Sequence, residues 1–520
     1  MSRMPARAFI LPVVLVVIGL LALTMAGFIF FIRAEVAGSL AAGAAQQARL
    51  AAESGLEEVV TTLRLHPHDA TVWFDAPSRF KHKLIWSSGY NRQSDPVART
   101  GTREVLQEEY SQPIPAWRFS VVGDSYQEAI SSDQQRIRFG ITPEAGKLNL
   151  NAATDEQITA LLTPLLQDLE MENAPALIAA LLDWRDTDDE TRENGAESDY
   201  YNTLEPPYNA KNGPLDSVEE LLLVKGFSAA VLYGEDVNRN GILDANEDDG
   251  EESFPEYDNR DGVLNRGIAP FLTVWTREPD TALDNRPRIN LNLDAAAVTA
   301  AIQTYFTEDE LAACQGAINY ITGLKNRGFD FSQLGSPAEL YRAGLTEEEG
   351  GGGPTELQDS PVTLDELPII LDRFSTRPLQ QTQTQGLVGL INVDTAPARV
   401  LGVVPGMTPE AVEAILAVRP ELTAQEARTP AWLLTREVMD VATFHAVAPY
   451  LTTKAYQFHV EVLGYADHLK VVGRWEWIIE MIGPLAQVRY SRDLSPLGLA
   501  WPVDDRELAG EGVTVQSRTR

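Results

Sequence analysis

Residues 9–32 read FILPVVLVVIGLLALTMAGFIFFI, a stretch without a single charged side chain. As a helix it is about 36 Å long at about 1.5 Å per residue, which exceeds the roughly 30 Å hydrocarbon core of a bilayer. Arg3 and Arg7 precede it, and positive charge before a span keeps the N-terminus in the cytoplasm. We therefore expect one membrane span, with everything after Arg33 outside the cytoplasm.

A cleaved signal peptide is the rival interpretation, but its apolar region would be shorter and would end in a small-residue cleavage site. Residues 33–65 are instead rich in Ala, Glu, Gln, Leu and Arg, with apolar residues at helical spacing. The membrane helix is therefore expected to continue outward as one rod. A plain signal anchor stays open as an alternative.

The composition indicates a folded, acidic protein of more than one domain. The chain has 520 residues, 44% of them hydrophobic, and a formal net charge of -33. Such a field repels nucleic acid and anionic lipid and attracts cations. Cys314 is the single cysteine of the sequence, so a disulfide within the chain is excluded, and its apolar helical surroundings predict a buried thiol.

Strand patterns occur in two places far apart in the sequence. They are strictly alternating or β-branched at 117–122, 136–141, 458–462, 469–479 and 486–490. We expect one antiparallel sheet built from both ends of the chain, which gives an α+β head interrupted by a large helical insertion.

The predicted insertion has an internal repeat. KLNLN at 147–151, RINLN at 288–292 and LINVD at 390–394 each precede a small-residue helix. The third unit also has VPGM at 404–407 between two helices, which predicts a helix-hairpin-helix (SAM-like) turn.

Such a turn can bind phosphate through backbone N–H groups, so nucleic acid is the alternative partner. The charged residues around it are Arg399, Arg419 and Arg428, set against Asp394, Glu410, Glu413, Glu421 and Glu426. Phosphate binding needs a basic patch. A structural hairpin is therefore favoured, and no nucleic-acid partner is expected.

Residues 236–247 read DVNRNGILDANE and match a twelve-residue EF-hand-type calcium loop. Gly241 permits the sharp turn at the sixth place. The predicted ligands are Asp236, Asn238, Asn240, Ile242 through its carbonyl, Asp244 and Glu247. An ordinary Asp/Asn/Gly turn is the alternative. The flanks are less helical than in an EF-hand pair, so we expect a loop-only Ca²⁺ site with an affinity of about 10⁻⁴–10⁻³ M.

A second acidic segment reads DWRDTDDE at 183–190 and continues with ESDYY at 197–201. Ionised carboxylates pack this densely only where a cation or an arginine offsets their repulsion. Arg185 and Arg192 are nearby in the sequence and could offset part of this repulsion. A solvated acidic loop is the alternative, and the further acids at 248–261 are not assigned to either site.

Catalytic motifs are not found. The sequence has no GxSxG, HExxH, P-loop or dinucleotide glycine motif, and His66 and His68 lack a third metal ligand at a recognisable spacing. We therefore do not expect an enzyme.

The N-terminus resembles that of a type IV prepilin: a short basic leader, then Ala8 and Phe9, then an apolar helix. The resemblance implies that a prepilin peptidase cuts between Ala8 and Phe9 and that the new N-terminus is methylated, although Gly usually precedes the cut. Val13 stands at the fifth mature position, where most pilins have Glu. An apolar residue there is typical of the general secretion pathway protein K family, and residues 183–214 resemble the signature region of that family.

The resemblance implies a minor pseudopilin at the tip of a type II secretion pseudopilus, anchored in the inner membrane with most of its chain in the periplasm. Expected partners are minor pseudopilins of the I and J kinds, the major pseudopilin, the prepilin peptidase and the inner membrane, and extraction from the membrane would be driven by a cytoplasmic ATPase. The family's helical domain carries calcium sites, and the matching candidate ligands are Asp186, Asp188, Glu197 and Asp199. Two alternatives remain: a membrane-tethered calcium-dependent adhesin and, less favoured, a periplasm-facing hydrolase.

The expected domain organisation follows the chain. It comprises a leader (1–8), the transmembrane and extended helix (9–65), the first part of the head (66–146), a first helical domain with calcium loops (147–285), a second helical region with the hairpin repeats (286–452), C-terminal strands (453–503) and a flexible tail (504–520).

Overall fold

The computed structural model describes residues 10–87, 116–123, 130–131, 137–255, 257–343, 345, 357, 359–379, 387–466 and 471–498. The predicted processing site at Ala8 and Phe9 and the predicted tail at 504–520 lie outside these residues.

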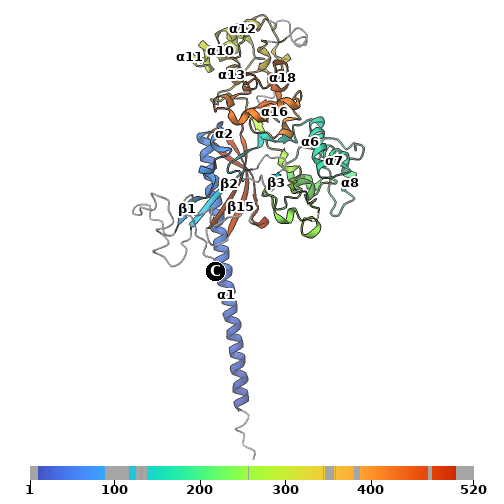
Figure 1. The fold of residues 1–520 in the computed structure, drawn as a ribbon, viewed down its shortest axis with the longest axis vertical. Helices are drawn as coiled ribbons and strands as arrows, with labels where there is room; N and C mark the ends of the chain where they lie inside the picture. Colours follow the sequence, from blue (N-terminus) through green and yellow to red (C-terminus); the bar gives the residue numbers. More distant parts are fainter. Residues whose placement is uncertain are drawn as a thin grey trace, which may run out of the picture.

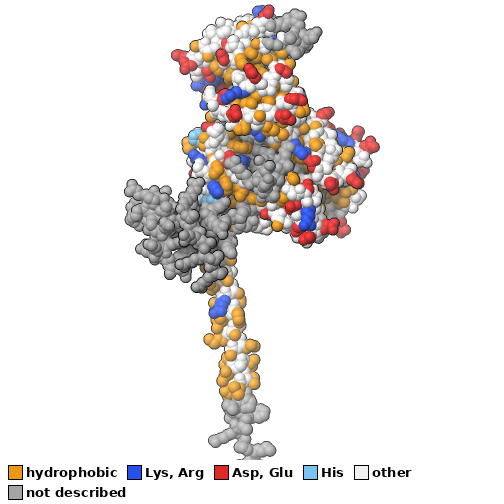
Figure 2. Space-filling view, in the orientation of Figure 1, with side chains coloured by type: hydrophobic (Ala, Val, Ile, Leu, Met, Phe, Trp, Pro, Cys, Tyr) orange, Lys and Arg blue, Asp and Glu red, His pale blue; other side chains and the backbone are white. Residues whose placement is uncertain are grey.

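The first element is α1, Ile10–Leu65, one helix of 56 residues, and the predicted continuous rod is confirmed (Figure 1). Its N-terminal part projects from the body and exposes apolar side chains along its length (Figure 2). From Val13 onward it is long and apolar enough to cross a membrane, with a mean hydropathy of 2.8 in its most apolar window. This exposed half suits lipid as its surroundings.

The C-terminal half of α1 packs on one antiparallel sheet. The strand order is β1 (Lys83–Ser87), β2 (Ala116–Val122), β14 (Gln457–Ala466), β15 (Val472–Ile482) and β16 (Leu485–Asp493), and the short β4 (Thr142–Pro143) also pairs with β14. The prediction that both ends of the chain build one sheet is therefore confirmed.

The strand predicted at 136–141 is wrong. Within its described part, Arg138 makes only an isolated bridge with Gly123. The Arg138 guanidinium donates to the carbonyls of Phe74 and Ile141. The segment therefore turns around its own arginine rather than extending along the sheet.

Two glycines let α1 approach the sheet closely. A Cβ at Gly464 of β14 would lie 2.0 Å from the carbonyl oxygen of Ala48, and one at Gly55 of α1 would lie 2.5 Å from a methyl of Val462. Any side chain at either place would push helix and strand apart.

The insertion leaves the sheet after β4 and returns at β14, where Pro143 is paired with Phe458. Two short helices, α2 (Ala70–Trp73) and α3 (Pro77–Phe80), come before it. Its helices are α6 (Asp155–Asp168), α7 (Ala174–Arg185), α8 (Ser198–Tyr201), α9 (Ala229–Tyr233), α10 (Ala295–Tyr305), α11 (Glu308–Ala313), α12 (Gln315–Asn326), α13 (Leu367–Arg373), α15 (Ala398–Leu401), α16 (Pro409–Val418), α17 (Trp432–Thr435) and α18 (Val441–Val447).

Three two-stranded parallel ladders recur along the described part of the insertion. They are β5 (Leu148–Asn149) with β7 (Leu272–Thr273), β9 (Ile289–Asn290) with β10 (Phe374–Ser375), and β12 (Ile391–Asn392) with β13 (Leu451–Thr452). In each ladder the asparagine amide donates to a carbonyl just beyond the returning strand: Asn149 to Thr276, Asn290 to Arg377 and Asn392 to Lys454. An equivalent hydrogen bond therefore joins the beginning of each segment to its end. Two further short antiparallel pairs join β3 (Ile130–Ser131) to β6 (Val263–Leu264) and β8 (Arg277–Glu278) to β11 (Leu387–Val388).

Among its described residues, the insertion has two main hydrophobic cores. The segments 148–272 and 391–451 share one, to which Ala338 and Leu367 also belong, whereas the other lies within 289–374. Cys314 is buried in the second, as predicted, and burial raises the pKa of its thiol to about 12. The 289–374 segment forms the lobe at the top of Figure 1.

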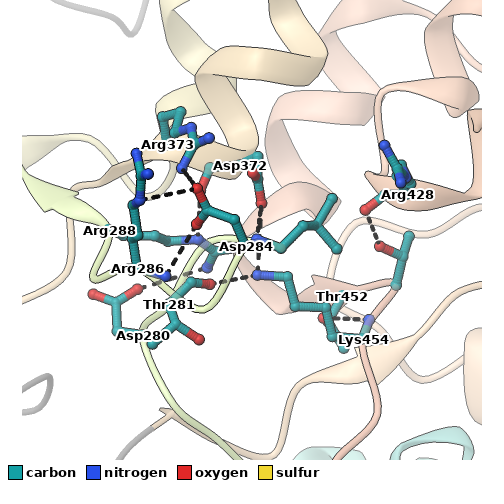
Figure 3. Close-up of polar contacts among 12 residues, drawn as sticks. Asp280, Thr281, Asp284, Arg286, Arg288, Asp372, Arg373, Arg428, Thr452 and Lys454 are labelled. Carbon is teal, nitrogen blue, oxygen red and sulfur yellow. Dashed lines mark hydrogen bonds and ion pairs between the residues drawn. The ribbon is translucent and has the colours of Figure 1, made fainter. Parts of the chain in front are cut away.

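A buried polar cluster lies where this upper lobe joins the body (Figure 3). The ammonium of Lys454 donates to the carbonyl of Thr281 at 2.5 Å and lies 3.7 Å from the carboxylate of Asp372. Arg373 pairs with Asp284 at 2.7 Å. Burial lowers the pKa of Lys454 to about 8. Charged side chains therefore add to the apolar contacts at this junction, where Ala338 and Leu367 of the upper lobe join the core of the body.

Candidate metal centres

A group of three carboxylates forms where α7 ends and α8 begins. Asp183 lies in the last turn of α7, Asp186 directly follows that helix, and Glu197 precedes α8. One carboxylate oxygen from each lies within 4.8 Å of the other two. Oxygen-only donor sets of this kind suit Ca²⁺.

Asp183 is the anchor of this group and is completely buried. Its carboxylate accepts hydrogen bonds from the backbone N–H groups of Ala196, at 2.8 Å, and of Arg192. The Arg192 guanidinium also bridges Asp183, at 3.0 Å, and Asp186. One arginine therefore offsets part of the charge on two of the three acids.

Glu197 is different, because only 2% of it is exposed and neither carboxylate oxygen finds a hydrogen-bond partner within the described part of the chain. Burial and then the nearby Asp183 and Asp186 raise the pKa of Glu197 to about 7. An unpartnered buried carboxylate is costly, and a bound cation would relieve that cost. The group thus fits a divalent cation on its own geometry.

The structure divides the residues predicted for this site. Asp186 and Glu197 belong to the three-carboxylate group, whereas Asp188 and Asp199 are exposed and lie outside it. Asp188 accepts a hydrogen bond from the backbone N–H of Glu190 at 2.9 Å. Sequence reasoning missed Asp183, although its spacing of three from Asp186 on a helical end is a signal that both face one side.

The twelve-residue loop at 236–247 is compact, with Asp236 and Glu247 almost fully buried. Asp236 accepts from the backbone N–H groups of Asn240, at 2.8 Å, and Gly241, at 2.9 Å. Gly241 has a φ of 66°, as the sharp turn at the sixth place requires. Glu247 folds back across the loop and accepts from the N–H of Asp244 at 3.1 Å.

The remaining predicted ligands of the loop converge as well. The amides of Asn238 and Asn240 both donate to one carboxylate oxygen of Asp244, at 2.6 and 2.9 Å. Ile242 donates its N–H to Asn240, and its side chain packs against the core of the sheet. The flanks are the five-residue α9 and a single turn at Ala245–Glu247, so the flanking structure is short, as the sequence predicts.

Burial is the main electrostatic influence on this loop. It raises the pKa of Asp236, and burial followed by the charge of Asp236 raises the pKa of Glu247 to about 8. Arg266 approaches Asp236 at 3.5 Å and lowers the cost of its charge. The donor set fits Ca²⁺, but a cation there would share Asp236 with this arginine.

Among the described acids of 248–255 and 257–261, Asp258 lies at the centre of a turn. Asp258 accepts from the backbone N–H groups of Asp249 and Gly250 at 2.7 and 2.6 Å. Glu235, next to the calcium-type loop, accepts from Asn259 and Asn265. In the structure these two carboxylates hold the turn itself together.

Comparisons with known proteins converge on one family. Residues 146–233 match the family model described as Type II secretion system (T2SS), protein K. Over 102 residues the chain is 38% identical to type II secretion system protein K of Klebsiella pneumoniae, which covers 18% of this chain and 31% of the relative. Over 125 residues it is 31% identical to the same protein of Pectobacterium carotovorum subsp. carotovorum, covering 22% and 36%. The matches thus span about a third of the length of these curated relatives.

A crystal structure of the GspK-GspI-GspJ complex from the enterotoxigenic Escherichia coli type 2 secretion system is also similar. It covers 86% of this chain and 96% of the chain compared, at 13% identity and a TM-score of 0.33. A TM-score this low does not establish a common arrangement of the whole chain.

Proposed function

We propose that this chain is a minor pseudopilin of the protein K kind in a type II secretion system. The observation that carries the proposal is the match at 146–233, because that segment contains the Asp183, Asp186 and Glu197 group and is attached to a head on a long N-terminal helix. The role is structural, and catalysis forms no part of it.

The proposed location is the inner membrane, with the N-terminus in the cytoplasm and the head in the periplasm. The exposed apolar half of α1 supports a single span, and Arg3 and Arg7 favour this orientation. In this proposal a prepilin peptidase removes residues 1–8. Val13 then leaves the mature helix without the acid that pairs with a neighbour's free N-terminus, which suits the first subunit of a filament.

The proposed position is the tip of the pseudopilus, beside minor pseudopilins of the I and J kinds and above the major pseudopilin. The size of the insertion supports a tip position, since a bulky head obstructs the stacking of a further subunit. We interpret the insertion as three related helical units, the third of which contains the helix-hairpin-helix turn at 404–407. The equivalent hydrogen bonds from Asn149, Asn290 and Asn392 support this repeat.

Ca²⁺ is the proposed cofactor, held by the Asp183, Asp186 and Glu197 group and by the 236–247 loop. When bound, it would supply positive charge to carboxylates that the fold has already desolvated. Its expected effect is stiffening of the head before assembly, and the unpartnered carboxylate of Glu197 is the main support.

The decisive experiment is genetic and chemical at once. The gene is deleted in its source bacterium, complemented with the full chain, and the culture medium is assayed for type II substrates while the membrane-extracted protein is sequenced from its N-terminus. We expect restored secretion and a chain that starts at Phe9 only in cells with an active prepilin peptidase. A chain that keeps residues 1–8 in such cells, with secretion unaffected by the deletion, would favour the tethered adhesin instead.

A further inference from the structure

Arg474 lies on β15 and is completely buried, directly beneath the 236–247 loop. Its Nε pairs with Glu461 of the neighbouring strand β14. Its two terminal nitrogens donate to the backbone carbonyls of Asn238, at 2.5 Å, and of Arg239, at 2.6 Å. A buried guanidinium is tolerated only when its donors are satisfied, and here every nitrogen has an acceptor.

The two carbonyls that Arg474 holds are not ligand atoms of a calcium-type loop. In such a loop the seventh residue, here Ile242, offers the carbonyl, and the third residue, here Asn238, offers its side chain. Arg474 therefore binds the loop through two backbone carbonyls that are not among its predicted ligand atoms. The Asn238 side-chain oxygen, which is a predicted ligand, accepts the N–H of Asn240 at 3.0 Å.

Other contacts fix the same part of the loop. Arg239 has a φ of 57°, and its guanidinium lies 3.6 Å from the ring centroid of Tyr233. The side chain of Ile242 packs against the sheet core. The loop thus rests on the sheet on both sides of Gly241, with Arg474 as its polar support.

We propose that Arg474 is a positioning residue that couples cation binding in the 236–247 loop to the sheet of the head. By holding the third and fourth residues of the loop in place, Arg474 reduces the ordering needed when a cation binds. Coupling of this kind is reciprocal, so a bound cation must stabilise the pairing of β14 with β15 around Arg474 and Glu461. The inference rests on the proposed calcium site of this loop.

The test uses the full chain in detergent, in a Glu197→Gln background that removes the other candidate site. The variants are Arg474→Lys, which keeps the charge but loses the fork of donors, and Arg474→Met with Glu461→Leu, which replaces the buried pair by an apolar one and protects the fold. Arg489→Lys on β16 is the matched control, since Arg489 pairs with Glu480 on the same sheet.

Calcium affinity is measured by titration calorimetry, and the exchange of β14 and β15 amides by mass spectrometry with and without calcium. Both Arg474 variants should weaken calcium binding roughly tenfold, the usual effect of losing a support behind a metal ligand. Calcium should slow exchange in β14 and β15 in the background protein but not in these variants. Arg489→Lys should leave both readouts unchanged.

An Arg474→Lys protein with unchanged calcium affinity and unchanged calcium-dependent protection of β14 and β15 would overturn the inference, even if its melting temperature fell. Failure of the underlying calcium site looks different. In that case Asp236→Asn combined with Glu247→Gln would bind calcium no less tightly than the Glu197→Gln background.

Discussion

The two candidate metal centres both contain buried carboxylates, yet they differ in whether every buried carboxylate has a hydrogen-bond partner. The 236–247 loop bonds its own acids to its own backbone, as with Asp236 and Gly241. The Asp183, Asp186 and Glu197 group gathers acids from two helix ends and leaves Glu197 without a partner. A contiguous loop can therefore hold its shape through its own hydrogen bonds, whereas the group assembled from separate segments keeps a buried, unpartnered carboxylate whose cost a bound cation would relieve.

The largest effect is expected from Asp183→Ala, which should lower the free energy of unfolding by about 3 kcal/mol. The substitution removes the acceptor for the N–H of Ala196 and for the Arg192 guanidinium, so the loss should occur with and without calcium. Urea unfolding measures it. Asp188→Ala is the control and should change stability by less than about 0.5 kcal/mol, since Asp188 is exposed. If both variants lost the same free energy of unfolding, Asp183 would not be the anchor of this group.

The effect of Glu197→Gln on the stability of the protein should have opposite signs in chelator and in calcium. In chelator the substitution removes a buried charge that lacks a partner and should raise the free energy of unfolding by about 1 kcal/mol. In millimolar calcium it removes a ligand and should be less stable than the parent. Melting temperatures in the two buffers measure both signs, and a shift of the same sign in each would contradict a cation at this group.

The pH dependence should separate the two sites in calcium-free buffer. The folded-state pKa is about 7 for Glu197 and about 8 for Glu247, both above the ordinary value of 4.5. The unfolded chain releases these protons first, so the free energy of unfolding falls as pH rises from 4.5 through 7 and 8 and is level beyond.

Melting scans between pH 5 and 9 measure this decline. Glu197→Gln should roughly halve the slope between pH 4.5 and 7, whereas Glu247→Gln should reduce it there and also abolish the decline between 7 and 8. Saturating calcium, which favours the ionised carboxylates, should flatten the decline in the parent. If stability still declined with pH in the protein carrying both substitutions, other titratable groups would be responsible for the decline.

The smallest effect is expected from Gly241→Ala, which should cost about 1 kcal/mol because alanine is strained at a φ of 66°. Gly323→Ala in α12 is the control: a Cβ there meets nothing within 4 Å, so it should stabilise the protein by about 0.5 kcal/mol or more. Urea unfolding in chelator compares them. If Gly241→Ala proved neutral, the loop would not be preformed and the contrast between the two centres would weaken.

Sequence reasoning succeeded where the signal was local and periodic. The apolar run at 9–32 formed a helix from Ile10 onward, and the alternation at 458–462 formed a strand. The 236–247 segment formed a compact turn, and cation binding there stays a prediction. The same reasoning failed at 136–141, because the contacts that turn the chain around Arg138 come from Phe74, which no local pattern reveals.

The acidic group illustrates the same limit at the level of a site. Asp183, Asp186, Asp188 and Asp199 are equally acidic in the sequence, and only the end of α7 decides which of them face Glu197. Likewise, Arg474 lies more than two hundred residues from the loop carbonyls it binds. Contacts of that range depend on how the insertion folds back on the sheet.

The place where the insertion leaves and rejoins the sheet has an evolutionary consequence. Pro143 and Phe458 are paired neighbours, so everything between them begins and ends at nearly one point. Closing a longer excursion between such points costs little additional entropy, because the penalty grows only with the logarithm of length. Descendants of this gene can therefore gain or lose whole helical segments at that point while the register of β14 against β15 is inherited unchanged.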